Sequence, residues 1–239
     1  MLKLLVGLAL LPSAVLMLGA AGGSLGTLIF REPQSSFPFL SGFASMALAW
    51  FCGRFFLVDD RGPVSWFGSL ARGLYVFGHE ATHALAAWFV GAKVFAFKVG
   101  ENGGHVDLSH SSAFIALAPY CLPLYSMLVL VGYRVLLWFK PGFQGYILFM
   151  VLIGLTLSFH IINTGECLWQ RRQPDLRAAG GAVFSLACIA IANGLVLLLL
   201  LKALFPRVVP LLDCLEAVIG RTWHFWKWGW QWARIAWMR

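Results

Sequence analysis

Three residues within one five-residue stretch could carry metal chemistry: His79, Glu80 and His83, in the order His-Glu-Ala-Thr-His. Residues four apart lie on the same face of a helix, so both histidines can present imidazole nitrogens to one metal ion. The carboxylate of Glu80 lies next to the first histidine, where it can accept a proton from water without binding the metal. The pattern therefore predicts a zinc site at His79 and His83, with Glu80 as the general base.

The neighbours of this motif favour a metal site over a chance match. On a solvated helix, two histidines can be satisfied by water, and the pattern then means little. Here the surrounding residues include Phe77, Leu85 and Trp88. Ionisable groups in an apolar segment are costly unless an ion or a partner compensates them.

Catalytic zinc usually has three protein ligands and one open position. Glu101 follows His83 at a spacing close to that of soluble zinc proteases, although a carboxylate in a turn is ordinarily just solvated. Asp107 and His110 could also line the site, or they are ordinary polar residues of a strand. His160 is a further candidate, or a histidine at a helix end that faces water. Asp175 lies shortly before the last long apolar segment. The residues alone leave the third ligand open.

A family resemblance bears on this choice. The motif in an apolar helix, the following Gly103-Gly104 and the late aspartate resemble the site-2 protease family of intramembrane zinc metalloproteases. In that family the third ligand comes from an Asn-x-x-Pro…Asp-Gly pattern, which corresponds here to Asn163, Pro174 and Asp175. The resemblance covers about residues 70–200. It implies that His79, His83 and Asp175 bind Zn²⁺, that Glu80 is the base, and that Asn163 contacts the substrate or the developing oxyanion.

The sequence departs from that pattern at several positions. Leu176 follows Asp175 where the family has glycine, and the residue directly before His83 is not glycine. The stretch Ala118–Leu122 only half matches the family's Gly-Pro-x-x-Asn. Asn163 also has an ordinary interpretation as a helix C-terminal cap before Gly165.

The composition indicates a membrane protein. Hydrophobic residues make up 60% of the 239 residues and charged residues only 12%, against roughly a quarter charged in soluble domains. Apolar stretches occupy residues 4–29, 37–57, 73–90, 112–139, 143–162 and 180–205. In lipid, such segments must satisfy their backbone polar groups internally and are therefore helical. We expect an all-α multi-pass fold with six transmembrane helices; the first segment also resembles a signal peptide, and we expect it to be retained.

Two segments depart from this pattern. Residues 92–110 alternate like a strand around Glu101-Asn102-Gly103-Gly104, which predicts a β-hairpin at the membrane surface. The tail, 206–239, is rich in tryptophan and follows a membrane domain of residues 1–205. Trp223, Trp226, Trp230 and Trp237 are expected on one helical face, with Lys227 and Arg234 opposite. Tryptophan favours the membrane interface, so we expect a surface-lying helix without chemistry of its own.

The charge pattern narrows the partners. The formal net charge is +8, but the basic residues are scattered and form no run suited to nucleic acid. Anionic lipid headgroups are the expected partner instead. The five cysteines form no Cys-x-x-Cys pair, so neither a disulfide framework nor a thiolate zinc site is inferred. We expect an integral protein of a cytoplasmic membrane of bacterial type.

These features lead to one main functional hypothesis and two alternatives. The main hypothesis is an endopeptidase that cleaves a membrane-spanning protein at or within the bilayer. One alternative is a non-catalytic membrane scaffold with the same fold, which would have no need of Glu80. The other is a metal transporter, which would be expected to place polar groups on several helices along a path. The first, second and sixth apolar stretches have almost none.

Overall fold

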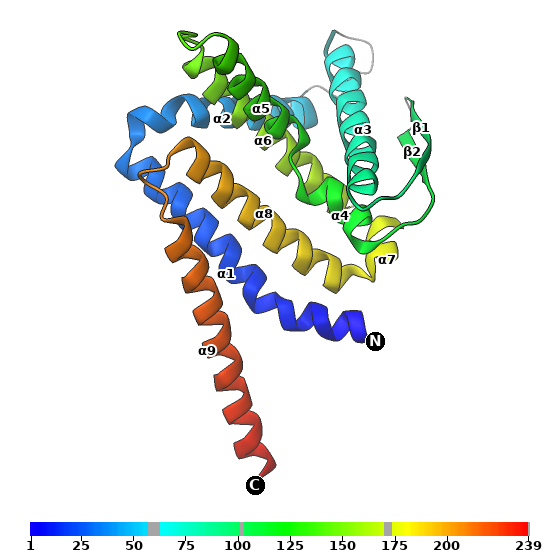
Figure 1. The fold of residues 1–239 in the computed structure, drawn as a ribbon, viewed down its shortest axis with the longest axis vertical. Helices are drawn as coiled ribbons and strands as arrows, with labels where there is room; N and C mark the ends of the chain where they lie inside the picture. Colours follow the sequence, from blue (N-terminus) through cyan, green and yellow to red (C-terminus); the bar gives the residue numbers. More distant parts are fainter. Residues whose placement is uncertain (57–62, 101–102, 170–173, 239) are drawn as a thin grey trace. The chain divides into compact units, whose positions relative to one another are not determined.

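The computed structural model describes residues 1–56, 63–100, 103–169 and 174–238, without the side chains of 54–56 and 63–67 (Figure 1). The described residues are mostly helical, with one small antiparallel sheet. The elements in chain order are α1 (Leu2–Arg31), α2 (Pro33–Phe56), α3 (Pro63–Phe89), β1 (Val94–Gly100), β2 (Gly103–Leu108), α4 (Ala113–Cys121), α5 (Leu124–Phe139), α6 (Tyr146–Trp169), α7 (Pro174–Ala179), α8 (Ala182–Leu204) and α9 (Leu211–Trp237).

Each of the six predicted apolar stretches is helical over most of its length, which confirms the mainly helical class. Four helices are long and apolar enough to cross a membrane, namely α1, α2, α6 and α8. A fifth span results if α4 and α5 are taken together as one broken segment. The described part of α3, which carries the polar motif, is not among these candidate membrane-spanning helices. Six spans therefore remain a prediction.

The break between α4 and α5 has a local cause. Pro123 has no backbone N–H and disfavours helical backbone angles at the residue before it. Leu122 accordingly has φ −111° and ψ 114°, an extended conformation that ends α4. The two helices are bent by 70° at this point. The chain thus contains a short helix, α4, which packs against α7.

The chain divides into two compact units, Gln34–Ala179 and Met1–Pro33 together with Gly180–Arg239. In the second of these, α1 and α8 run parallel, because Gly7 meets Phe184 and Met17 meets Gly194. The glycines let the helices approach closely: a Cβ at Gly7 would lie 2.7 Å from the backbone of Phe184. Small residues at such contacts are typical of helices packed in a membrane.

The helix α9 forms in the tail, as predicted, and only part of it packs on α1. Ser13 lies 3.3 Å from Thr222, and Ser24 lies 3.6 Å from Cys214, so the two helices are antiparallel. Beyond Thr222, α9 diverges from α1 (Figure 1).

The expected placement of the tail's charges was wrong. Lys227 and Arg234 each follow a tryptophan of the predicted stripe by four residues, Trp223 and Trp230. Residues four apart share a face of a helix. The cations therefore lie beside the tryptophan stripe and not opposite it.

The predicted hairpin is confirmed by β1 and β2, which pair antiparallel with Lys98 opposite His105 and Gly100 opposite Gly103. The register shifts between Val94 and Ala96, which marks a bulge at the base of the hairpin. Glu101 and Asn102 lie outside the described residues. Whether the hairpin lies at a membrane surface remains a prediction.

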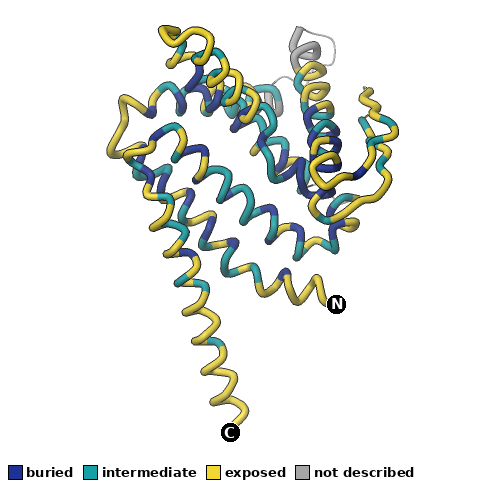
Figure 2. Tube along the Cα trace, in the orientation of Figure 1, coloured by how far each residue is buried: buried dark blue, intermediate teal, exposed yellow. Residues whose placement is uncertain are grey.

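The hairpin returns the chain to α3, whose last turns pack on α4. Ala86, Ala87, Ile115 and Ala118 form a small buried apolar cluster together with Ala92, which begins the hairpin segment. Alanine at these positions allows α3 and α4 to approach closely. This contact places α4 beside the histidine face of α3. In Figure 2 the buried residues of this region are drawn in dark blue along both helices.

The contact between α2 and α6 yields a test of the fold. A Cβ at Gly154 would collide with the carbonyl oxygen of Phe39 and lie 2.9 Å from the nitrogen of Phe43. We expect Gly154→Ala to destabilise the protein by about 1–3 kcal/mol through overpacking. The readout is the thermal unfolding midpoint in detergent.

Gly165 provides the matched control on the same helix, because a Cβ there meets nothing within 4 Å. Gly165→Ala should leave the midpoint unchanged or raise it, since alanine is favoured over glycine in a helix by about 0.5–1 kcal/mol. Equal midpoints for the two variants would contradict the close α2–α6 contact.

Candidate metal centre

The first part of the site is a single turn of α3. The helix runs without interruption through His79, Glu80 and His83, so the two histidines lie one above the other on one face. Their ring centroids are 4.9 Å apart and the ring planes are 82° apart. The perpendicular arrangement lets both rings direct a nitrogen toward a common point.

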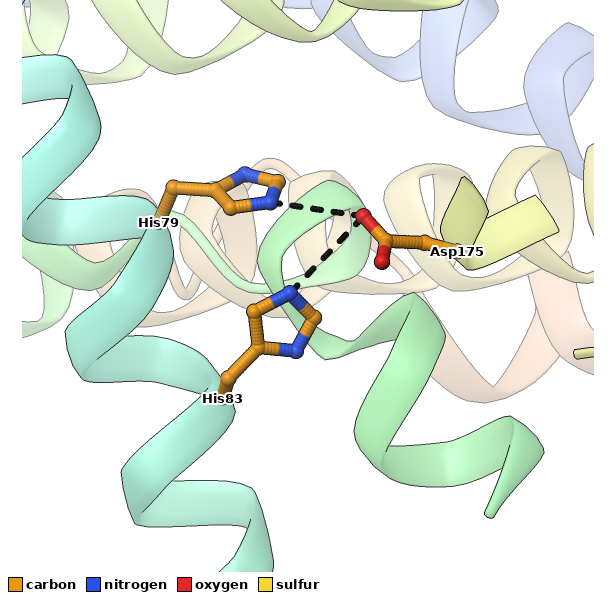
Figure 3. Close-up of side chains that lie close together, drawn as sticks. All are labelled: His79, His83 and Asp175. Carbon is orange, nitrogen blue, oxygen red and sulfur yellow. Dashed lines mark ion pairs between the residues drawn. The ribbon is translucent and has the colours of Figure 1, made fainter. Parts of the chain in front are cut away.

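The second part is Asp175, in the first turn of α7 (Figure 3). Its Oδ2 lies 3.5 Å from Nε2 of His79 and 3.8 Å from Nε2 of His83. The three side chains each offer one ligand atom, and these atoms all lie within 4.8 Å of one another. Bond lengths to zinc of about 2.0–2.2 Å place tetrahedral ligand atoms about 3.4 Å apart. The three atoms therefore fit a single ion with little rearrangement.

Neighbouring groups orient the two imidazole rings. Nδ1 of His83 lies 2.9 Å from the carbonyl oxygen of Ile115, to which an N–H at that position donates. Nδ1 of His79 lies 3.5 Å from the hydroxyl oxygen of Tyr75. The carbonyl holds a proton on Nδ1 of His83, so Nε2, the atom that faces Asp175 in each ring, would be the one to bind a metal ion there.

A buried tyrosine holds the carboxylate. The hydroxyl of Tyr120 donates a hydrogen bond of 2.7 Å to Oδ2 of Asp175, and its ring meets the edge of His79 at 5.3 Å. The thiol of Cys167 lies 3.8 Å from the same hydroxyl. α4 thus supplies a contact to every residue of the triad, through Ile115 and Tyr120.

These contacts determine the charge state of Asp175. Burial of the carboxyl by itself raises its pKa, but the hydrogen bonds with His79, His83 and Tyr120 outweigh burial and hold the pKa well below its usual range. The group is therefore a carboxylate at neutral pH. An anion between two imidazole nitrogens is a suitable environment for a divalent cation.

The cluster opens into a cavity of about 750 Å³. Glu80 lines it and is only 8% exposed. Strand β2 forms one wall, and a Cβ at Gly104 would lie 2.6 Å from Cγ of Glu80. Only glycine lets β2 approach the stem of the predicted base this closely. The cavity is large enough to admit a segment of peptide beside the metal ligands.

The remaining ligand candidates have different positions. Asp107 and His110 line the cavity from the hairpin side but do not join the triad. His160 lines a smaller cavity of about 30 Å³, which His79 also lines. Glu101 lies outside the described residues, so its role remains untested.

Asn163 is separate from the triad. Its side-chain amide donates to the carbonyl of Phe159 at 2.7 Å, a bond within α6. The helix continues to Trp169, so the interpretation of Asn163 as a C-terminal cap is wrong. Among the described residues that line the large cavity, Asn163 is absent. Its predicted contact with substrate stays a prediction.

Sequence reasoning missed the groups that orient the triad. The carbonyl of Ile115 has one sequence signal, Pro119 four residues later, which has no N–H to pair with it; the sequence does not show that His83 takes that place. Tyr120 lies in the stretch that half matched the family pattern, but nothing there distinguished it from an ordinary core tyrosine. Its only available signal was a phenol next to Pro119 in an otherwise apolar segment.

Comparisons with protein family models, with curated proteins and with solved structures found no match to this chain. The functional interpretation therefore depends on the motif and on the geometry of the site. Two imidazoles and one carboxylate form a donor set that suits zinc and also other first-row metals. Among the described residues, the triad is the group that could hold a metal ion.

The triad predicts the outcome of a metal assay on the purified protein. Asp175→Ala should strip the metal, because two neutral imidazoles alone bind zinc weakly. Asp107→Ala, which removes a carboxylate from the same cavity, should keep it. We expect Glu101→Ala to keep it too. Zinc per protein chain, measured in detergent, is the readout; loss of metal from the Glu101 variant and retention by the Asp175 variant would reassign the third ligand to the hairpin.

The hydroxyl of Tyr120 predicts a smaller effect. Tyr120→Phe removes one hydrogen bond to Asp175 and should weaken metal binding by about 10–100-fold without unfolding the protein. Competition with a chelator measures the affinity. Tyr125→Phe is the matched control, because its hydroxyl bonds the carbonyl of Leu74 and no triad residue. Equal affinities of the two variants would show that Tyr120 does not orient the carboxylate.

Proposed function

We propose that this protein is an integral membrane zinc metalloendopeptidase that cleaves a membrane-spanning protein substrate. The observation that carries the proposal is the position of Glu80. It lies beside His79 on the helix that also presents His83, and it lines the same cavity as the triad. A carboxylate next to a three-ligand metal site is the arrangement of zinc-dependent hydrolases.

Each residue has a defined role in this proposal. His79, His83 and Asp175 would hold the ion, which supplies Lewis acidity for the carbonyl and lowers the pKa of water when bound. Glu80 would accept a proton from the attacking water on its carboxylate. It would then return that proton to the amide nitrogen that leaves as an amine. Tyr120 and Ile115 would keep the ligands oriented through both steps.

The substrate class follows from the helices and the hairpin. Four helices long and apolar enough to cross a membrane support an integral location. A transmembrane substrate hides its amides in its own hydrogen bonds and must unwind before attack. Because β2 lines the cavity, its free edge could pair with the unwound segment in an extended form. The resemblance to site-2 proteases supports the same substrate class.

The scaffold and transporter alternatives have less support. A scaffold has no use for Glu80, whose burial in an apolar segment is costly. A transporter requires successive sites, and the described residues offer one group that could hold a metal. Neither alternative explains a buried carboxylate adjacent to the triad.

The decisive variant is Glu80→Gln. It preserves the shape of the side chain and removes its ability to accept a proton, so cleavage should fall by about 10²–10⁴-fold while the metal stays bound. The measurement compares membranes from cells that express either form. Mass spectrometry of labelled protein N-termini should find new termini within apolar spans only with the unaltered protein.

The companion measurements separate the alternatives. Asp107→Ala, from the same cavity, should give the same new termini as the unaltered protein. Bound zinc without any dependent termini would exclude the protease and favour the scaffold. Zinc uptake into vesicles that contain the purified protein would favour the transporter.

A further inference from the structure

The second half of α9 is exposed along its whole length. From Trp223 to Met238 every residue except Gly229 is exposed, whereas Val218 in the first half is buried and Thr222 contacts α1. This half is drawn in yellow almost throughout in Figure 2. It contains six tryptophans, between 43% and 92% exposed: Trp223, Trp226, Trp228, Trp230, Trp232 and Trp237.

Water is a poor solvent for this segment. A contiguous apolar surface of this kind indicates an interaction site. A helix of about 15 residues is also marginal in water without a surface to pack against. Something must therefore cover residues 223–238, and the charges of the segment indicate what.

The segment is cationic without compensation. Arg221, Lys227 and Arg234 are the formally charged side chains from Ala217 to Met238, and no acidic residue occurs there. Three cations on one short helix disfavour the hydrocarbon core. They also disfavour a second copy of the same helix, because the like charges would face each other. The interface of an anionic membrane suits both kinds of residue, because tryptophan favours the headgroup region and cations are attracted to anionic headgroups.

The length of the tryptophan-rich segment favours a helix that lies close to the membrane plane. The six tryptophans extend over about 21 Å of helix axis, whereas the headgroup layer of one leaflet is only about 5–8 Å thick. A helix along the membrane normal could keep few of them in that layer. A helix close to the membrane plane keeps the stripe of Trp223, Trp226, Trp230 and Trp237 there, since these four share one face. Lys227 and Arg234 lie beside the stripe of Trp223 and Trp230, so their ammonium and guanidinium groups reach the same layer.

We propose that residues 223–238 bind anionic phospholipid headgroups, with Lys227 and Arg234 contacting phosphate oxygens and the tryptophans inserted at the interface. The first half of α9 is held by α1, and the second half is the lipid-binding arm. The inference is independent of the proposed protease activity, because no residue of this arm belongs to the metal centre.

The test uses the full chain in nanodiscs of phosphatidylcholine, with and without phosphatidylglycerol. Amide hydrogen exchange of peptides from residues 223–238 is the readout. Exchange should be slower with phosphatidylglycerol, and added salt should remove the difference because it screens surface charge. Each cation near an anionic surface contributes about fivefold to binding, so Lys227→Gln with Arg234→Gln should reduce the protection by about thirtyfold.

A matched pair of exposed cations outside α9 provides the control. Arg134→Gln with Lys140→Gln removes the same charge and should leave the exchange of residues 223–238 unchanged. Equal exchange in the two lipids, or equal effects of the two double variants, would overturn the proposal. Protection that depends on two copies per nanodisc would assign the surface to self-association instead. Zinc content should be the same in all of these variants, which separates this result from the fate of the protease proposal.

Discussion

The carboxylate of Asp175 brings together side chains of α3, α4 and α7, which lie far apart in the sequence. It lies between Nε2 of His79 and Nε2 of His83, with the Tyr120 hydroxyl on the same oxygen. Ionisable groups in apolar surroundings are costly one by one, and together they compensate each other. The packing of α4 on both α3 and α7 brings the two histidines and the carboxylate together. A bound cation would replace these contacts by coordination, and the ligand atoms would stay nearly as far from one another as they are without it.

The broken segment α4–α5 is the second constraint, because it carries the groups that orient the triad. Within α4, Pro119 has no N–H, so the carbonyl of Ile115 four residues earlier lacks its helical partner and is left to accept from His83. Pro123 ends α4 early, and the short helix presents both the Ile115 carbonyl and the Tyr120 hydroxyl to the site. Irregular backbone of this kind is tolerated at membrane depth only where protein surrounds it or a cavity adjoins it. Here Pro123 is fully buried, and Leu122 lines the smaller cavity.

In the other compact unit, the helices are apolar and pack through close backbone contact. Gly7 and Gly194 allow α1 and α8 to approach as parallel neighbours, and α9 begins along the same surface. Lipid is as apolar as leucine, so close backbone contact and a few hydroxyl hydrogen bonds must hold such helices together. The aromatic, cationic end of α9 has no counterpart in this packing. Its chemistry is that of the membrane interface.

The sequence by itself determined the features that depend on local periodicity. Residues four apart share a helix face, so the pairing of His79 with His83 could be predicted, and alternation predicted the hairpin. The same rule, applied correctly, places Lys227 and Arg234 beside the tryptophans. The third member of the triad depended on tertiary structure, because no period relates Asp175 to α3 and its prediction came from family resemblance alone. Tyr120 and the Ile115 carbonyl were out of reach for the same physical reason: their roles arise where separate helices pack together, and local chain geometry carries no record of that contact.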